Sequence, residues 1–147
     1  MSDIRRWTAD RVRYAAGPTY QRAEIPMEAF GKARPRVTVN GTYMPRGYSA
    51  ARKELRRRFG EVAVAPPWVV RVTTVRQMPV SWSKRKRAAH DGAWCTTKPD
   101  VDNVLGAVMD ALFGEDAAVV SAGAEKQWGQ EHLLVIEVWA AGERPME

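Results

Sequence analysis

Two aspartates one residue apart open the stretch KPDVDNVLGAVMDAL, which runs from Lys98 to Leu112. Alternate residues of an extended segment face the same side, so Asp100 and Asp102 can present their carboxylates together. Two such carboxylates stay ionised more easily when a cation lies between them, and carboxylate oxygens suit Mg²⁺ or Mn²⁺. The pair therefore indicates a divalent-metal site. The simpler alternative is a helix cap, for which one aspartate is enough.

Two further aspartates follow. Asp116 comes just after the helix that this stretch predicts and is a third candidate metal ligand, provided that the fold returns it toward the first pair. Asp110 lies eight residues after Asp102, which is about 12 Å along a helix. Because one metal ion cannot bind both, Asp110 is predicted to support the structure or the site rather than to share the ligand set.

The net charge of +6 is unevenly distributed along the chain. Residues 1–99 contain 21 Lys and Arg and 7 Asp and Glu, a net of +14, whereas residues 100–147 contain 2 and 10, a net of −8. A basic surface attracts a polyanion and an acidic cluster attracts a cation. A chain with both can bind nucleic acid and place a metal ion next to it. The alternative is that the two segments pair across the fold.

Length and composition set broad limits on the class of protein. The 147 residues suit a single domain, and no apolar run is long enough to cross a bilayer. The N-terminal residues lack the apolar core of a signal peptide. Cys95 is the only cysteine, so no intrachain disulfide can form. These features predict a cytoplasmic location.

Two basic segments are candidates for contact with nucleic acid. Lys32, Arg34 and Arg36 alternate along a segment that reads as extended, so their side chains are predicted to project to one side. A charged edge strand that resists aggregation has the same pattern. Trp82 and Trp94 flank the second segment, which lies in a long loop and contains Lys84, Arg85, Lys86 and Arg87. Each tryptophan either stacks on an unpaired base or packs at the edge of the core.

The elements that must position these residues form an α+β pattern. Residues 49–59 and 102–113 are predicted to be helices, because their apolar residues fall on one stripe. Strands are predicted within residues 21–39 and at 67–76, 117–128 and 131–140, with a turn at Asn40–Gly41 and a hairpin at Gly129–Gln130. Residues 78–97 are predicted to be a long loop with a short helical piece. Together these elements predict a small mixed, mostly antiparallel sheet with two helices packed on it. This fold is expected in one domain of residues 21–147, and residues 1–20 are expected to form a short helix or arm before it.

Several motifs in a fixed order resemble the RusA-type Holliday junction resolvases. They are KPD-x-DN followed by an apolar residue, then DAL, then a short acidic loop with A-x-V-V, preceded by GKARPR at Gly31–Arg36 and SWSKRKR at Ser81–Arg87. The resemblance covers about residues 21–140. It implies a RusA-like fold and a Mg²⁺-dependent endonuclease that acts as a homodimer on four-way DNA junctions, as phage and prophage members of the family do.

The resemblance also implies roles for single residues. Asp100, Asp102 and Asp116 match the catalytic acids that bind the metal. The family's catalytic lysine belongs four residues after the second aspartate, where this chain has Gly106. We therefore expect either that another cation, with Lys98 as the first candidate, supplies the missing charge, or that the protein binds branched DNA with weak or no catalysis.

Lys126 falls where family members often carry a lysine and is predicted to contact DNA. It lies ten residues after Asp116, about 33 Å along a straight strand. It is therefore not expected at the metal site unless the strand bends or a partner subunit brings it. A metal-dependent nucleotidyl- or glycosyltransferase is disfavoured, because no Gly-rich phosphate loop accompanies the acids.

Overall fold

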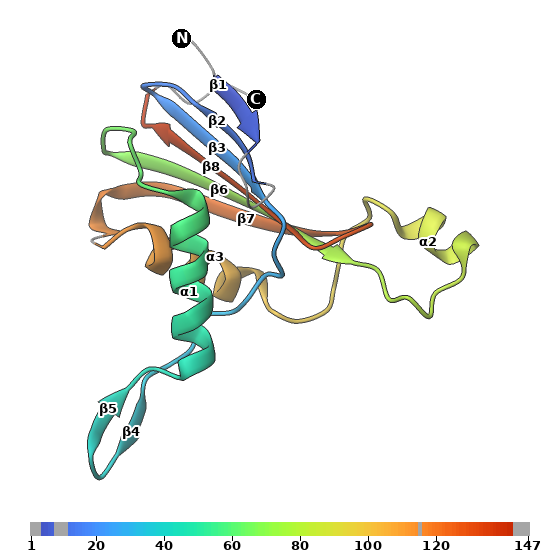
Figure 1. Cartoon of the computed structure of the whole chain (residues 1–147), viewed down its shortest axis with the longest axis horizontal. Coiled ribbons are helices and arrows are strands. Elements are labelled where there is room, and N and C mark those ends of the chain that lie inside the picture. The colour runs from blue at the N-terminus through green and yellow to red at the C-terminus, as the bar shows by residue number, and fades with distance from the viewer. Residues whose placement is uncertain (1–3, 8–11, 115, 143–147) are drawn as a thin grey trace.

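A six-stranded sheet forms the centre of the molecule (Figure 1). The structure is a computed structural model and describes residues 4–7, 12–114 and 116–142. The strands lie in the order β1-β2-β3-β8-β6-β7, with bounds Ile4–Trp7, Arg13–Ala16, Tyr20–Ile25, Leu133–Ala140, Trp68–Gln77 and Val119–Gly129. β6 and β7 pair parallel and the other neighbours pair antiparallel. The predicted α+β fold with a mixed, mostly antiparallel sheet is confirmed.

The predicted hairpin at Gly129–Gln130 is wrong, because β6 lies between β7 and β8. β6 takes this central position with its adjacent residues Val69 and Val70 both buried, one on each face of the sheet. The short link between β7 and β8 crosses the end of β6, where the backbone N–H of Gln77 donates to His132 Nδ1 at 3.2 Å. A parallel pair needs a long crossover, and residues 78–118 provide it.

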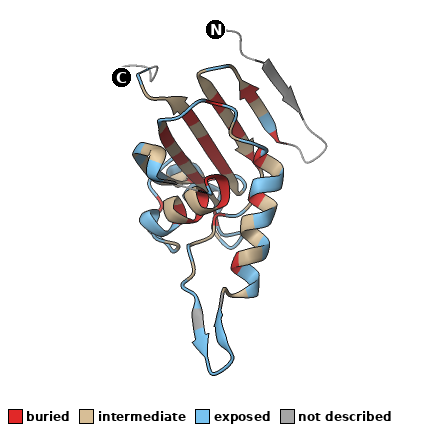
Figure 2. Ribbon diagram, turned by 90° about the vertical axis from the view of Figure 1, so that its left-hand side faces the viewer, coloured by how far each residue is buried: buried red, intermediate tan, exposed pale blue. Residues whose placement is uncertain are grey.

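Two helices cover one face of the sheet, α1 (Arg46–Phe59) and α3 (Val101–Leu112) (Figure 2). Leu55 of α1 and Val104 and Val108 of α3 are buried in one apolar core with the inward side chains of the sheet. The prediction of α3 is confirmed to within one residue at each end. α1 ends before Gly60 as predicted but begins three residues earlier, because the turn that contains the buried Tyr48 continues the helix toward Pro45.

Residues 4–7 and 13–16 form β1 and β2 and extend the sheet, so the short helix or arm predicted for residues 1–20 is not what the described part of this segment forms. β2 pairs with β3 along residues 13–16. Without it, β3 would be an open edge with unpaired backbone groups. Val12 and Ala15 are buried here, which adds apolar packing to the backbone pairing.

Two extensions leave the sheet and its helices (Figure 1). One is the hairpin of β4 (Arg36–Thr38) and β5 (Gly41–Tyr43), which confirms the predicted turn; Gly41 has a φ of +120°. The other is the segment 78–97, in which α2 (Lys84–His90) is the predicted helical piece. The Ser83 hydroxyl caps α2 by accepting from the backbone N–H of Lys86 at 3.1 Å. In the described residues, no helix has the length and apolar character that a membrane span requires.

Candidate metal and nucleic-acid site

Asp100 and Asp102 lie at the start of α3. Asp100 occupies the N-cap position, but its side chain makes no capping hydrogen bond. Instead it accepts from Lys98 Nζ at 2.7 Å. Asp102 lies in the first turn, where its exposed carboxylate makes no hydrogen bond or ion pair with the described residues. The side chain of Asp100 therefore does not act as a helix cap. The dipole at the N-terminus of α3 favours the negative charges of both aspartates.

Lys98 controls the electrostatics of Asp100. Its hydrogen bond, and then its charge, hold the pKa of the Asp100 carboxyl below the ordinary value, against the opposing effect of desolvation; the charge of Lys126 adds a smaller contribution. The Lys98 side chain is 84% exposed, so water screens the pair and the effect on stability is small. Its consequence is that Asp100 stays ionised to lower pH.

A Lys98→Ala variant is expected to shift the acidic limb of any Asp100-dependent activity to higher pH. Removal of the ammonium raises the pKa of Asp100, so a larger fraction of the carboxylate is protonated at a given acidic pH. The measurement is a pH–rate profile of parent and variant. Unchanged acidic limbs would contradict this role of Lys98, and an unchanged rate at neutral pH would exclude a direct catalytic one.

Lys126 lies closer to this pair than the sequence suggested. Its Nζ donates to the backbone oxygen of Thr97 at 2.6 Å and to that of Pro99 at 3.0 Å. Residues 93–99 run beside β7, with the N–H of Cys95 bonded to the carbonyl of Lys126 at 3.1 Å. The spacing from Asp116 along the strand did not indicate this, because the 93–99 loop folds back onto β7. Lys126 thus joins β7 to the residue before Asp100.

The Gly31–Arg36 segment crosses the beginning of α3. The backbone N–H of Lys32 donates to the carbonyl of Asn103 at 3.0 Å. A Cβ at Gly106 would lie 3.3 Å from Cδ of Lys32, so the lysine stem fills the space beside this glycine. Lys32 and Arg34 line one hollow of about 420 Å³ together with Asn103 and Asp110. The prediction that these cations share a side agrees with this placement for Lys32 and Arg34, while the side chain of Arg36 lies outside the described residues.

Asp110 joins the two helices. Its Oδ2 accepts from the Tyr48 hydroxyl at 2.6 Å and from Arg52 Nη1 at 2.9 Å. The Tyr48 hydrogen bond is the main cause of the lowered pKa of Asp110, and burial beside this carboxylate raises the pKa of Tyr48. These contacts explain Asp110 as a structural residue that fastens α3 to α1.

An Asp110→Asn variant is expected to lower the free energy of unfolding by about 1–2 kcal/mol near neutral pH, since a charge-assisted bond to Arg52 is lost. The pKa of Asp110 is lowered in the folded protein, so its contribution is complete above the ordinary value of 3.8 and declines as the pH falls below it. Urea unfolding at several pH values measures the difference. A gap between parent and variant that widens with acid would contradict this assignment.

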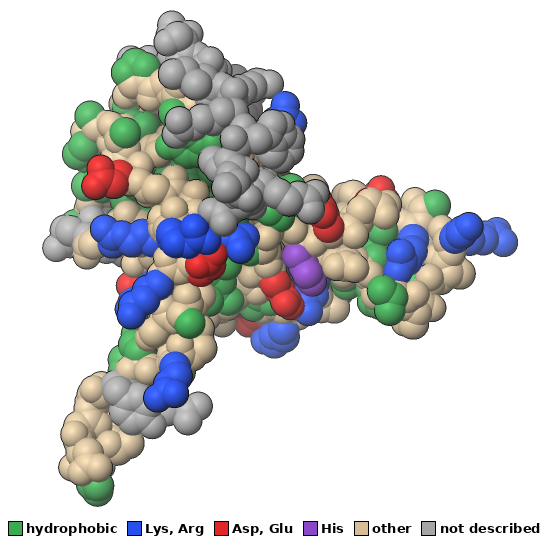
Figure 3. Space-filling model, in the orientation of Figure 1, with side chains coloured by type: hydrophobic (Ala, Val, Ile, Leu, Met, Phe, Trp, Pro, Cys, Tyr) green, Lys and Arg blue, Asp and Glu red, His purple; other side chains and the backbone are tan. Residues whose placement is uncertain are grey.

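In the α2 extension, two of the four basic side chains, Lys86 and Arg87, contact other residues of the same extension. Trp82 packs against Trp128 and His90, each at 5.0 Å between ring centroids, and Lys86 Nζ lies 4.3 Å from the centroid of Trp82. Trp82 thus follows the core-edge alternative, whereas Trp94 is 69% exposed and remains a candidate for base stacking. Arg87 donates to the carbonyl of Pro79, and Lys84 and Arg85 are exposed. Figure 3 shows Lys and Arg side chains over α1 and along this extension.

The donor set at the start of α3 fits a hard divalent ion. No three His, Cys, Asp or Glu side chains within the described ranges gather as a metal cluster. Asp116 begins the 3₁₀ turn Asp116–Ala118, but its side chain lies outside the description. Mg²⁺ commonly takes one or two carboxylates and completes its shell with water and substrate phosphate, so two exposed aspartates that no helix cap engages suit it.

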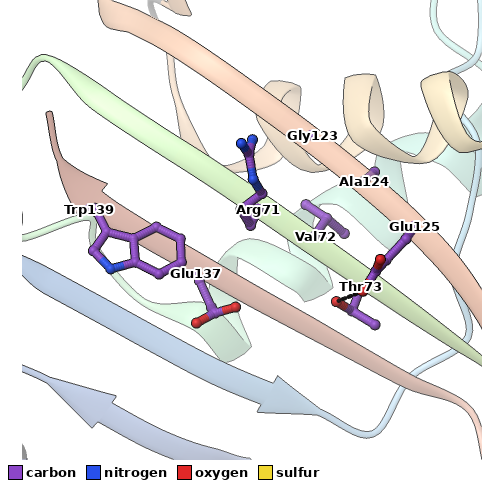
Figure 4. Close-up of a pocket in the computed structure, with 8 residues that line it drawn as sticks. All are labelled: Arg71, Val72, Thr73, Gly123, Ala124, Glu125, Glu137 and Trp139. Atoms are coloured by element: carbon purple, nitrogen blue, oxygen red, sulfur yellow. Dashed lines mark hydrogen bonds between the residues drawn. The ribbon is translucent and has the colours of Figure 1, made fainter. Parts of the chain in front are cut away.

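A second hollow, of about 360 Å³, lies on the sheet face opposite the helices (Figure 4). Arg71 covers Gly123 there, since a Cβ on that glycine would be 2.8 Å from Arg71 Nη1. None of the residues that line this hollow is a predicted site residue, so the hollow is not part of the candidate site.

Exposed carboxylates bordered by lysines and arginines are compatible with a site that acts on a polyanion, and comparison with known proteins identifies the class. The family model of endodeoxyribonuclease RusA matches residues 26–139. The chain therefore belongs to the RusA family and is an endodeoxyribonuclease, which confirms the resemblance to RusA-type Holliday junction resolvases. No match was found among curated proteins or solved structures. β1, β2 and β3 all precede the matched region.

Proposed function

We propose that this endodeoxyribonuclease is a Mg²⁺-dependent, structure-selective enzyme that resolves four-way DNA junctions by paired nicks as a homodimer. The observation that carries the proposal is the pair Asp100 and Asp102 at the start of α3, within the region matched by the family. Mn²⁺ suits the same ligands. A phage or prophage gene and a location in the bacterial cytoplasm fit this activity.

In this proposal Asp100 and Asp102, with Asp116, hold the metal ion. When bound, Mg²⁺ would activate water and neutralise charge on the scissile phosphate. Lys98 keeps Asp100 ionised through the 2.7 Å hydrogen bond. Lys126 holds the carbonyls of Thr97 and Pro99 and so fixes the backbone that leads into Asp100. These residues set the position and the charge of the ligands.

The cations around the site would bind the DNA backbone. They are Lys32, Arg34 and Arg36 in the loop before and at the start of β4, Lys84, Arg85, Lys86 and Arg87 in α2, and Lys126 in β7. Each phosphate contact releases condensed counterions, so binding should weaken steeply with salt. A four-way junction has approximate two-fold symmetry, which matches a dimer with two identical sites.

A synthetic four-way junction labelled on each strand tests the proposal. Mg²⁺ should produce symmetric nicks in opposing strands, and EDTA should abolish them; a linear duplex of the same sequence should remain largely intact. Gel electrophoresis under denaturing conditions reads the nicks, and a native gel reads binding. A protein that binds the junction but leaves it intact in both Mg²⁺ and Mn²⁺ would instead be the branched-DNA-binding protein that Gly106 suggested.

A further inference from the structure

The side chain of Lys32 occupies an unusual position for an exposed lysine. Its backbone is fixed to α3 by the hydrogen bond to the carbonyl of Asn103. Its stem lies over Gly106, with Cδ 3.3 Å and Cβ 3.7 Å from the place where a Cβ on that glycine would be. The preceding residue, Gly31, is as closely packed, since a Cβ there would lie 3.4 Å from Asn103 Cβ and 3.5 Å from Pro99 Cβ. The loop is therefore docked on the segment that carries both aspartates.

Position 106 lies one helical turn after Asp102 and on nearly the same face of α3. Glycine in a helix costs about 1 kcal/mol relative to alanine. Even an alanine here would press against Cδ of Lys32. Gly106 thus creates the space through which the Lys32 stem passes along α3. A side chain at position 106 would require the Lys32 stem to shift by a few tenths of an ångström, so lysines at positions 32 and 106 would compete for the same space beside α3.

The other cations near the start of α3 already have partners. Lys98 Nζ donates to Asp100, and Lys126 Nζ donates to two backbone carbonyls. Arg52 is paired with Asp110 at 2.9 Å. The ammonium of Lys32 makes no hydrogen bond or ion pair within the described part of the chain, and the side chain is exposed. Its charge acts on Asp110, where it helps to lower the pKa of that carboxyl, but no described side chain bonds the ammonium, so it can bind a phosphate that approaches the start of α3.

We infer that Lys32, docked over Gly106, contacts the scissile phosphate and supplies the charge that a lysine at position 106 would have supplied. The inference rests on the proposed nuclease function. It explains the glycine and the lysine together, because removal of the side chain at 106 admits the side chain from 32. It also assigns the two basic residues of this loop different roles: Lys32 acts at the reacting phosphate, and Arg34, on the same hollow, binds the DNA backbone.

The experiment moves the lysine from one position to the other. Four proteins are compared with the parent: Lys32→Met, which keeps the stem, Lys32→Arg, which keeps the charge, the double variant Lys32→Met with Gly106→Lys, and Lys53→Met, a control that removes an exposed cation on α1. Each is assayed for kcat and KM on the four-way junction. Junction binding is also measured without metal, in EDTA, by fluorescence anisotropy at several salt concentrations.

Lys32→Met is expected to lower kcat at least about tenfold, which is the effect of one lost charge-assisted contact, and to reduce the salt slope of metal-free binding by about one. Lys32→Arg should retain most of kcat, the double variant should recover it, and Lys53→Met should match the parent. A Lys32→Met protein with the parental kcat overturns the inference, as does a loss that the lysine at 106 fails to restore. A parent that binds but never nicks overturns the proposed function as well, so the two failures are distinguished.

Discussion

An Asp102→Asn variant is expected to lose junction nicking by about a thousandfold while it binds the junction as tightly as the parent. The exposed carboxylate of Asp102 has no partner within the described structure, so the substitution breaks no structural contact there. It removes a negative charge that a divalent ion needs and that the DNA backbone repels. Loss of kcat with retained or improved affinity is therefore the signature of a metal ligand. Single-turnover nicking and metal-free anisotropy measure the two quantities separately.

Glu131→Gln is the matched control for this experiment. It also exchanges an exposed carboxylate for an amide, but in the link between β7 and β8. It should leave nicking unchanged. If Asp102→Asn retains more than about a tenth of the parental rate, the metal site lies elsewhere. If both variants lose activity alike, the loss reflects net charge rather than a ligand.

The acidic segment was predictable from the sequence because its signals are local. The apolar stripe of α3 sets the helix, and Asp100 and Asp102 belong to its first residues whatever the rest of the fold does. Gly41 and Gly60 are similar cases, since a glycine adopts positive φ readily and so marks the turn before β5 and the end of α1. The order of the motifs then identified the family, and the family match over residues 26–139 confirmed it.

The arrangement of the sheet was not predictable in the same way. Nothing within residues 117–140 shows that β6 separates β7 from β8, because the insertion depends on a strand fifty residues earlier in the chain. β1 and β2 were missed for a related reason. Each is only four residues long, and the pairing of β2 with the open edge of β3 decides their conformation.

The positions of the cations near the aspartates could not be predicted either, because they depend on contacts between distant parts of the chain. Lys126 was placed far from the site by counting residues along one strand, yet the 93–99 loop returns the chain to it. Lys32 was read as one of three alternating charges, although its contact with Gly106 joins positions 74 residues apart. A signal was present in the sequence: a glycine inside a helix, at a place where a family lysine was expected, indicates that another group needs the space.

A Lys126→Met variant is expected to reduce kcat for junction nicking by about a hundredfold, as the loss of catalytic positioning does. Methionine keeps most of the stem but removes the ammonium that holds the carbonyls of Thr97 and Pro99. Those carbonyls lie in the backbone that leads directly into Asp100. Without the ammonium, residues 93–95 stay bonded to the backbone of β7, but Thr97 and Pro99 lose their bonds to it and Asp100 is held less firmly. Steady-state nicking of the four-way junction measures the effect.

A double-mutant cycle with Asp100→Asn separates positioning from DNA binding. If Lys126 acts through Asp100, the Met substitution adds little to the loss that Asp100→Asn already causes, because the two residues form one unit. Lys126→Met should also move the acidic limb of the pH–rate profile to higher pH, since the charge of Lys126 lowers the pKa of Asp100. If Lys126 instead acts as a simple phosphate ligand, the two losses multiply and metal-free binding weakens with a smaller salt slope. The cycle therefore decides whether Lys126 positions Asp100 or binds a phosphate of the DNA.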